Sequence, residues 1–377
     1  MRTAESDLAM TERDIARLRA YLEGSIPLPP SIRTHTRRRQ VELAVSLAGR
    51  VPIYLDSRFW IDLRRADEGG ETSPAHPLLM ALRAAVLAGR LFCPISAGTF
   101  IEMMKHADAE VRRRTAALVD ELSLGVAVVA LDELLAAEVR WFAIDFTDAP
   151  LDPTIEPVWT RLACALGTVF PEIAEMTARE QLAVQVVGFD AIWQTTLEEV
   201  AALLPDPARP DFRGAAERMT RDSAAHAREI PSFEAAYRAE LVPMAKMGGD
   251  LLGRHLRDRA VTAGQSPPAL DEADVSAFRN AVGNALALGK ARQSLRSAHI
   301  RAALHAIIRH NRGRKFKAND ILDIEHAVCG IGYCRAFFTE GSMGTAATQP
   351  PLGLDRLYGC FVSSDVEAAT RFVTNLG

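Results

Sequence analysis

Between residues 51 and 131, short runs of apolar residues alternate with segments that have the hydrophobic period of a helix. VPIYL, LFCPI and GVAVVAL are continuous apolar runs with the length of buried strands. Helical patterns such as SRFWIDLRRA and SAGTFIEMMKHA lie between them. Because strand and helix alternate with short connections, we predict parallel strand pairing in an α/β sheet.

The same alternation returns at the C-terminal end of the chain. After Lys317, the helical pattern NDILDIEHAVCGIG leads into the apolar run AFFT, and YGCFVS precedes a closing helix, DVEAATRFVTNL. In between, long helical patterns follow one another, divided by proline-rich breaks and without a repeat of fixed period. We therefore predict one sheet domain that is interrupted by helices. Its expected parts are N-terminal helices (1–50), a first sheet segment (51–133), an all-helical insertion (134–317) and a second sheet segment (318–377).

Composition and charge narrow the class of protein. Hydrophobic residues make up 48% of the chain and charged residues 24%, which is typical of a globular protein. The formal net charge of −4 gives no overall attraction to nucleic acid, so such binding needs a local basic patch. The five cysteines are dispersed and form no Cys-x-x-Cys pair, which argues against a zinc site and a disulfide framework and predicts a reducing, cytoplasmic setting. The chain shows neither a signal-peptide pattern nor an apolar stretch of about 18 residues, so we expect no membrane segment.

Acidic residues stand at four corresponding places in this pattern. Asp56 ends the first strand, and Glu102 lies one helical turn after the second. Asp323 lies near the start of the helix before the fourth strand, and Glu340 ends that strand. Because ligands bind at the carboxyl ends of the strands in an open α/β sheet, we expect the four carboxylates to converge there.

Converging carboxylates repel one another unless protons or cations neutralise them. A set of oxygen ligands favours hard cations such as Mg²⁺ or Mn²⁺. Such ions can orient a phosphodiester, activate a water molecule and stabilise the leaving oxygen. The pattern therefore predicts hydrolytic phosphodiester chemistry.

Each of these residues also has a simpler structural interpretation. Asp56 alone is most often a helix N-cap. Asp320 follows Asn319 at a helix start, so capping explains it better, although it can serve as an auxiliary ligand beside Asp323. His326, three residues after Asp323, can hydrogen-bond to that carboxylate or to a substrate phosphate, and a structural role is equally compatible with the sequence.

Three basic runs are candidates for phosphate contacts: residues 37–39, 112–114 and 309–317. Basic runs are more often solvated faces than binding sites. The last run, RHNRGRKFK, leads directly into the helix that holds Asp323. Its candidate nucleic-acid contacts are Arg309, Arg312, Arg314, Lys315 and Lys317.

In order and spacing, three segments resemble the PIN-like nuclease family, which includes many bacterial toxin ribonucleases. They are IYLDSRFWIDL, PISAGTFIEMM and DIEHAVCGIGYCRAFFTEGSM, and the resemblance covers roughly residues 51–131 and 318–376. It implies a three-layer PIN-like fold in which Asp56, Glu102, Asp323 and Glu340 hold Mg²⁺ or Mn²⁺ and Ser57 orients Asp56. Two positions depart from the family pattern, because Arg58 stands where asparagine is frequent and Glu340 where aspartate is commoner.

The resemblance further implies a metal-dependent endoribonuclease, often dimeric, for which a regulatory protein partner such as an antitoxin is one expectation. Three other functions are compatible with the same residues. A nuclease of this fold can act on DNA, including branched structures. A degenerate domain can bind nucleic acid without cleaving it. A largely helical scaffold can carry these acids as ordinary surface residues.

Overall fold

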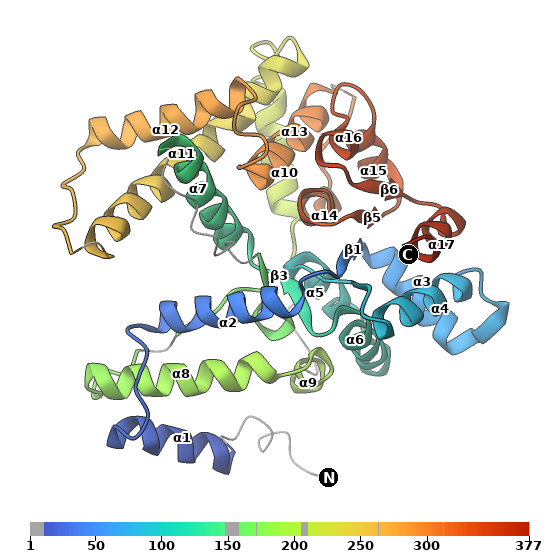
Figure 1. Cartoon of the computed structure of the whole chain (residues 1–377). Helices are drawn as coiled ribbons and strands as arrows, with labels where there is room; N and C mark the ends of the chain where they lie inside the picture. The colour runs from blue at the N-terminus through green and yellow to red at the C-terminus, as the bar shows by residue number, and fades with distance from the viewer. Residues whose placement is uncertain are drawn as a thin grey trace. The chain divides into compact units, whose positions relative to one another are not determined.

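The computed structural model describes residues 11–147, 158–170, 172–204, 210–262, 264–311 and 313–376 (Figure 1). The chain forms an α/β structure that is mostly helical, and its contacts divide it into two compact units. Unit 1 comprises Met1–Arg50, Phe92–Ala130 and Pro157–Ala208. Unit 2 comprises Val51–Leu91, Leu131–Glu156 and Arg209–Gly377.

A four-stranded sheet joins the two ends of the chain. Its strands are β1 (Val51–Leu55), β2 (Leu91–Phe92), β5 (Ala336–Phe338) and β6 (Phe361–Ser363), in the order β2-β1-β5-β6. β5 runs parallel to both β1 and β6, and Leu55 is in register with Phe338. The last three residues of β1 have no exposed surface, as expected for an apolar strand covered on both faces. The predicted pairing of N-terminal and C-terminal strands in one α/β sheet is confirmed.

Helices cover the sheet of unit 2. α3 (Ser57–Gly69) follows β1 directly and buries an apolar stripe that includes Phe59 and Leu63. α4 (His76–Leu87) packs against α3 and against α17 (Val366–Thr374). α14 (Ala318–Tyr333) packs on β1 and β5 and is buried along most of its length. Two short helices, α15 (Gly341–Thr348) and α16 (Leu354–Tyr358), connect β5 to β6.

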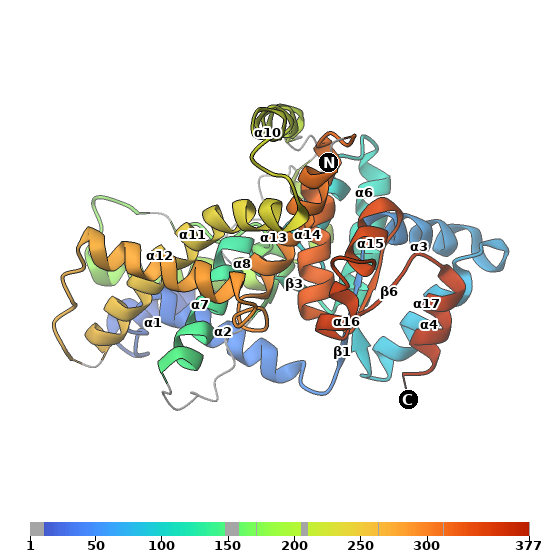
Figure 2. The same cartoon turned by 90° about the horizontal axis from the view of Figure 1, so that it is seen from above.

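A second, all-helical core of unit 2 is built from the middle of the chain. Its helices are α7 (Leu131–Thr147), α11 (Phe233–Thr262), α12 (Glu272–Ala287) and α13 (Arg296–His310). A further helix of this unit, α10 (Arg213–Ala225), packs on α14. α11 and α12 run side by side (Figures 1 and 2). Their backbones approach closely at Gly249, where an added Cβ atom would lie 2.6 Å from the backbone nitrogen of Arg279. The absence of a side chain at this position allows the two helices to pack.

Unit 1 is a helical body with a small two-stranded sheet. Its helices are α1 (Glu12–Glu23), α2 (Ile32–Ser46), α5 (Ala97–Met104), α6 (Ala109–Ser123), α8 (Ala178–Gln194) and α9 (Leu197–Leu203). The buried carboxylate of Asp190 on α8 accepts hydrogen bonds from Arg17 of α1 (2.6 Å) and is 2.9 Å from His35 Nε2 of α2. These contacts hold α1 and α2 against α8.

The third predicted strand has a different partner from the one expected. β3 (Val126–Val128) pairs antiparallel with β4 (Trp159–Arg161), and a single parallel bridge joins Ala127 to Ile95. β4 lies within the segment that we predicted to be all-helical, because a strand of three residues is too short to show a period of its own.

The two compact units do not follow the order of the chain. Residues 92–130 group with the N-terminal helices, and the middle of the chain is shared between both units. Hydrophobic periodicity marks where an element begins and ends, but not which other element covers it. In the described part of the chain, no helix combines the length and the apolar character needed to cross a membrane.

Candidate functional site

Asp56 occupies the junction between the ends of β1 and β5. Its Oδ1 accepts hydrogen bonds from the N–H groups of Arg58 (3.1 Å) and Phe59 (3.3 Å), so that it caps α3. Its Oδ2 accepts a hydrogen bond from the N–H group of Glu340, at 2.8 Å. The Asp56 N–H group in turn donates to the carbonyl oxygen of Phe338. Asp56 is only 7% exposed, and three backbone N–H groups fix its orientation.

Glu340 lies two residues after β5, beside Asp56, and its carboxylate is already paired. Oε2 of Glu340 is 3.1 Å from Nη1 of Arg58, and Nε of Arg58 is 3.3 Å from Oδ2 of Asp62. The structure therefore brings Asp56 and Glu340 together, with Arg58 as the counter-charge of Glu340. Ser57, which was expected to orient Asp56, is the half-buried first residue of α3.

α14 brings Asp323 toward the same edge of the sheet. His326 of this helix is buried, and its Nδ1 is hydrogen-bonded to the Tyr54 hydroxyl at 2.8 Å. α14 leads into β5 through a short connection, so it runs opposite to the strands and its N-terminal half lies toward their carboxyl ends. Asp323 is about 4.5 Å nearer that edge than His326, and Asp56 lies about 7 Å beyond Tyr54 along β1. These spacings place the backbone of Asp323 toward the carboxyl ends of the strands, and its side chain is half-buried.

Asp320 has the structural role that its position in the helix favours. It is buried, and its carboxylate accepts hydrogen bonds from the N–H group of Lys317 (2.8 Å) and from Arg314 (2.6 Å). A carboxylate satisfied in this way stabilises the start of α14.

Two arginines of the basic run before α14 form ion pairs within the protein. Arg309 pairs with Asp222 (2.9 Å) and Glu240 (2.7 Å), and Arg314 pairs with Asp320. Arg312 lies outside the described residues. Lys315 and Lys317 are exposed. Of the predicted nucleic-acid contacts, Arg309 therefore links α13 to α10 and α11, and Arg314 links the loop before α14 to the start of that helix. The two lysines face solvent.

Glu102, the fourth acid, lies on α5 and is half-buried. It belongs to unit 1, whereas the other three acids belong to unit 2. Within the described residues, no three His, Cys, Asp or Glu side chains are arranged as a ready metal site. The edge thus has the oxygen donors that a hard cation prefers, but backbone N–H groups and Arg58 occupy those of Asp56 and Glu340.

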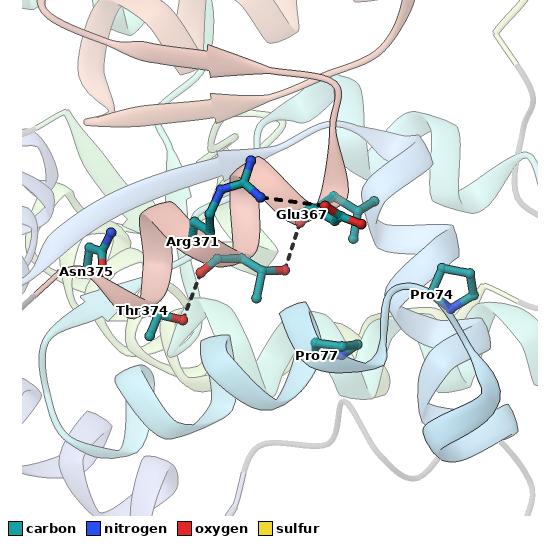
Figure 3. A pocket seen from close by; sticks show the side chains of 8 residues that line it. Pro74, Pro77, Glu367, Arg371, Thr374 and Asn375 are labelled. Atoms are coloured by element: carbon teal, nitrogen blue, oxygen red, sulfur yellow. Dashed lines mark hydrogen bonds and ion pairs between the residues drawn. The ribbon is translucent and has the colours of Figure 1, made fainter.

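The pocket of unit 2 that Figure 3 shows does not coincide with this edge. Pro74 and Pro77, at the start of α4, line it together with residues of α17 such as Glu367 and Thr374. None of the predicted acids lines it. The hydroxyls of Thr370 and Thr374 donate to backbone carbonyls of their own helix, so both form hydrogen bonds within α17.

Sequence reasoning missed a buried polar cluster in the helical core of unit 2. Glu138 of α7 has no exposed surface, and its carboxylate accepts hydrogen bonds from the N–H and hydroxyl groups of Ser297 and from the Tyr333 hydroxyl. Burial raises the pKa of Glu138 to about 7, although these hydrogen bonds act in the opposite direction. The sequence signal was a single glutamate within the apolar pattern LLAAEVRWF.

Comparison of the chain with protein-family models, with curated proteins and with solved structures gives no match.

Proposed function

We propose that unit 2 carries a metal-dependent phosphodiester hydrolase site that acts on RNA, at the carboxyl edge of β1 and β5. The hydrogen bond between the Glu340 N–H group and Asp56 Oδ2 carries this proposal. It joins two acidic residues from opposite ends of the chain at the ends of neighbouring parallel strands, where α/β sheets bind their ligands. The choice of RNA as substrate rests on the resemblance of these segments to PIN-like ribonucleases.

The residues of this edge have distinct roles in the proposal. Asp56, Glu340 and Asp323 would hold the ion. A bound Mg²⁺ or Mn²⁺ would supply an activated water molecule and stabilise the leaving oxygen. Asp56 contributes a carboxylate whose orientation is fixed before any ligand binds, because three N–H groups hold it. Glu340 contributes a longer and exposed side chain that can change its partner.

A second function, binding of nucleic acid without cleavage, is favoured by one observation. Arg58 already neutralises Glu340, so the edge is stable without a metal ion. A domain of this kind would bind RNA through exposed residues such as Lys315 and Lys317, and its affinity would fall with increasing salt.

Cleavage of labelled single-stranded RNA and of DNA with the same sequence, in Mn²⁺, Mg²⁺ or EDTA, tests the proposal. We expect cleavage of RNA that requires the metal ion and that falls by at least about tenfold in Glu340→Gln and Asp323→Asn. Asp67→Asn is the matched control, because Asp67 is another ion-paired acid of α3 but lies far along the helix from its start. Cleavage that persists in EDTA contradicts the proposal, and RNA binding without cleavage supports the second function.

A further inference from the structure

The start of α14 and the neighbouring helix α10 carry exposed cations that form no ion pair with the described acidic side chains. Lys315 and Lys317 lie just before α14, and both are exposed. Arg218 and Arg221 are exposed residues of α10, which packs on α14. Ala216 is the buried residue of α10, and at about 3.6 residues per turn both arginines lie on the opposite side of the helix.

Two hydrogen bonds join α10 to the segment before α14. The Thr220 hydroxyl accepts a hydrogen bond from the Phe316 N–H group at 3.1 Å and donates to the Phe316 carbonyl oxygen at 3.5 Å. Arg221 follows Thr220 in the chain. Lys315 and Lys317 stand on either side of Phe316. The hydrogen bonds therefore bring cations together from two segments that lie 96 residues apart in the chain.

The acidic residues of these two segments do not cancel this positive charge. Three acids between residues 211 and 222 and between 313 and 320 form ion pairs with arginines: Asp211 with Arg213, Asp222 with Arg309, and Asp320 with Arg314. Glu217 is the other acid there, and it is exposed. The four cations outnumber it, although the whole chain has a net charge of −4. The fold thus creates a local basic surface of the kind that a nucleic-acid backbone requires.

This basic surface adjoins the edge that we propose as the hydrolase site. Lys317 is the N-cap of α14, and Asp323 lies six residues later, which is about 9 Å along the helix axis at about 1.5 Å per residue. The start of α14 lies toward the carboxyl ends of β1 and β5, because this helix runs opposite to the strands. A strand of nucleic acid that contacts the basic surface can therefore reach that edge.

We propose that the outer face of α10 and the segment before α14 form one binding surface for the phosphate backbone of RNA, which holds the substrate beside the sheet edge. Its contacts are Arg218, Arg221, Lys315 and Lys317, whose charged N–H groups match phosphate oxygens. Contacts of this kind position a strand without reading its bases, so we expect little dependence on sequence. The choice of RNA rests on the proposed function, whereas the place of the surface rests on the exposed cations.

Fluorescence anisotropy of labelled single-stranded RNA with the full chain tests this surface. Binding is measured in EDTA, where a metal-dependent site cannot cleave, between about 50 and 200 mM KCl. We expect Arg218→Gln/Arg221→Gln and Lys315→Gln/Lys317→Gln each to weaken binding by about tenfold. Each double variant should also reduce the slope of log affinity against log salt concentration by about 1.4, because two phosphate contacts are lost.

Lys246→Gln/Arg257→Gln is the matched control. Both residues are exposed on α11 of the same unit, and neither has a carboxylate partner among the described side chains. The control removes the same charge as each surface variant but should leave the affinity and the salt slope unchanged. Circular dichroism establishes that all variants are folded.

The outcomes separate this surface from the proposed hydrolase. A wild type that does not bind RNA overturns the surface, and so does an equal loss of affinity in the control and in the surface variants. If the surface variants alone lose affinity but the wild type cleaves no RNA with Mn²⁺ or Mg²⁺, the RNA surface stands and the hydrolase falls. If the wild type cleaves RNA and the surface variants keep its affinity and KM, the hydrolase stands and the surface falls.

Discussion

Replacement of Glu138 by glutamine should make unit 2 less sensitive to pH. Glu138 connects α7 to the start of α13, through Ser297, and to the end of α14, through Tyr333. Its carboxyl group is removed from water, and burial is the main cause of its pKa of about 7. The charged side chain that acts on it most is Arg296, which favours the ionised form but does not offset burial.

The size and sign of the effect follow from this pKa. A rise from the ordinary value of 4.5 to about 7 corresponds to about 3 kcal/mol, at about 1.4 kcal/mol per pKa unit. Between these two pH values the folded protein keeps a proton that the unfolded chain has released. The contribution to stability is therefore complete below the unfolded pKa and is lost as the pH rises through the folded pKa. The free energy of unfolding should fall by about 3 kcal/mol between pH about 4.5 and pH about 7, and then level off.

Glutamine preserves the shape of the cluster and removes the titration. Its oxygen can accept from the Ser297 N–H group and the Tyr333 hydroxyl, and its amide nitrogen can donate to the Ser297 hydroxyl oxygen. In urea unfolding followed by circular dichroism, Glu138→Gln should match the wild type near pH 5 and exceed its stability by up to about 3 kcal/mol at pH 8. Glu234→Gln, at an exposed glutamate of α11, is the control. A variant that keeps the pH dependence of the wild type, or that is less stable at pH 8, refutes this reasoning.

Three further substitutions test other contacts of the fold by denaturant unfolding. Asp56→Ala leaves three N–H groups without their acceptor and should lower the free energy of unfolding by about 2 kcal/mol. Asp56→Asn should lose less. An unchanged denaturation midpoint for the alanine variant would contradict the role of these hydrogen bonds in joining β1, α3 and the end of β5. Gly249→Ala places a Cβ atom 2.6 Å from the Arg279 nitrogen. By forcing α11 and α12 apart, it should lower the free energy of unfolding by about 1–3 kcal/mol. Unchanged stability would show that the two helices pack less closely here. Burial of Asp190 opposes its ionisation, but hydrogen bonds from His35 and a neighbouring arginine lower its pKa below the ordinary 3.8. The stability that the ionised Asp190 contributes is present above the unfolded pKa and is lost as the pH falls through the lower folded pKa. Asp190→Asn should therefore destabilise unit 1 at neutral pH by about 3 kcal/mol and much less in acid, and a uniform loss at every pH would argue against the ion pairs.

Much of the sheet and one part of the site could be predicted without coordinates. A strand covered on both faces must be apolar throughout, so the runs at Val51 and Ala336 identified β1 and β5. An aspartate between a strand and a helix is a favoured N-cap because its side chain accepts the free N–H groups of the first turn, and Asp56 has that role. These inferences succeeded because each depends on a few consecutive residues.

Which carboxylates of this edge have a counter-charge could not be predicted in the same way. The sequence placed four carboxylates at corresponding strand and helix ends, but whether a carboxylate is free depends on its neighbours in space. Arg58 neutralises Glu340, and Arg314 neutralises Asp320. Glu102 belongs to the other unit of the chain. Ion pairs leave no periodic signal, because each partner alone resembles a solvated surface charge.

The sequence by itself thus predicted the strands β1 and β5, their apolar character, and the place of Asp56 at the end of a strand. Tertiary structure alone decided that β3 pairs with β4, that Glu138 lies out of contact with water, and that Arg58 reaches Glu340. The reason is physical. Local patterns record how much of each element is buried, whereas the identity of its partner, and with it the pKa and the counter-charge of every buried acid, is set by packing between residues far apart in the chain.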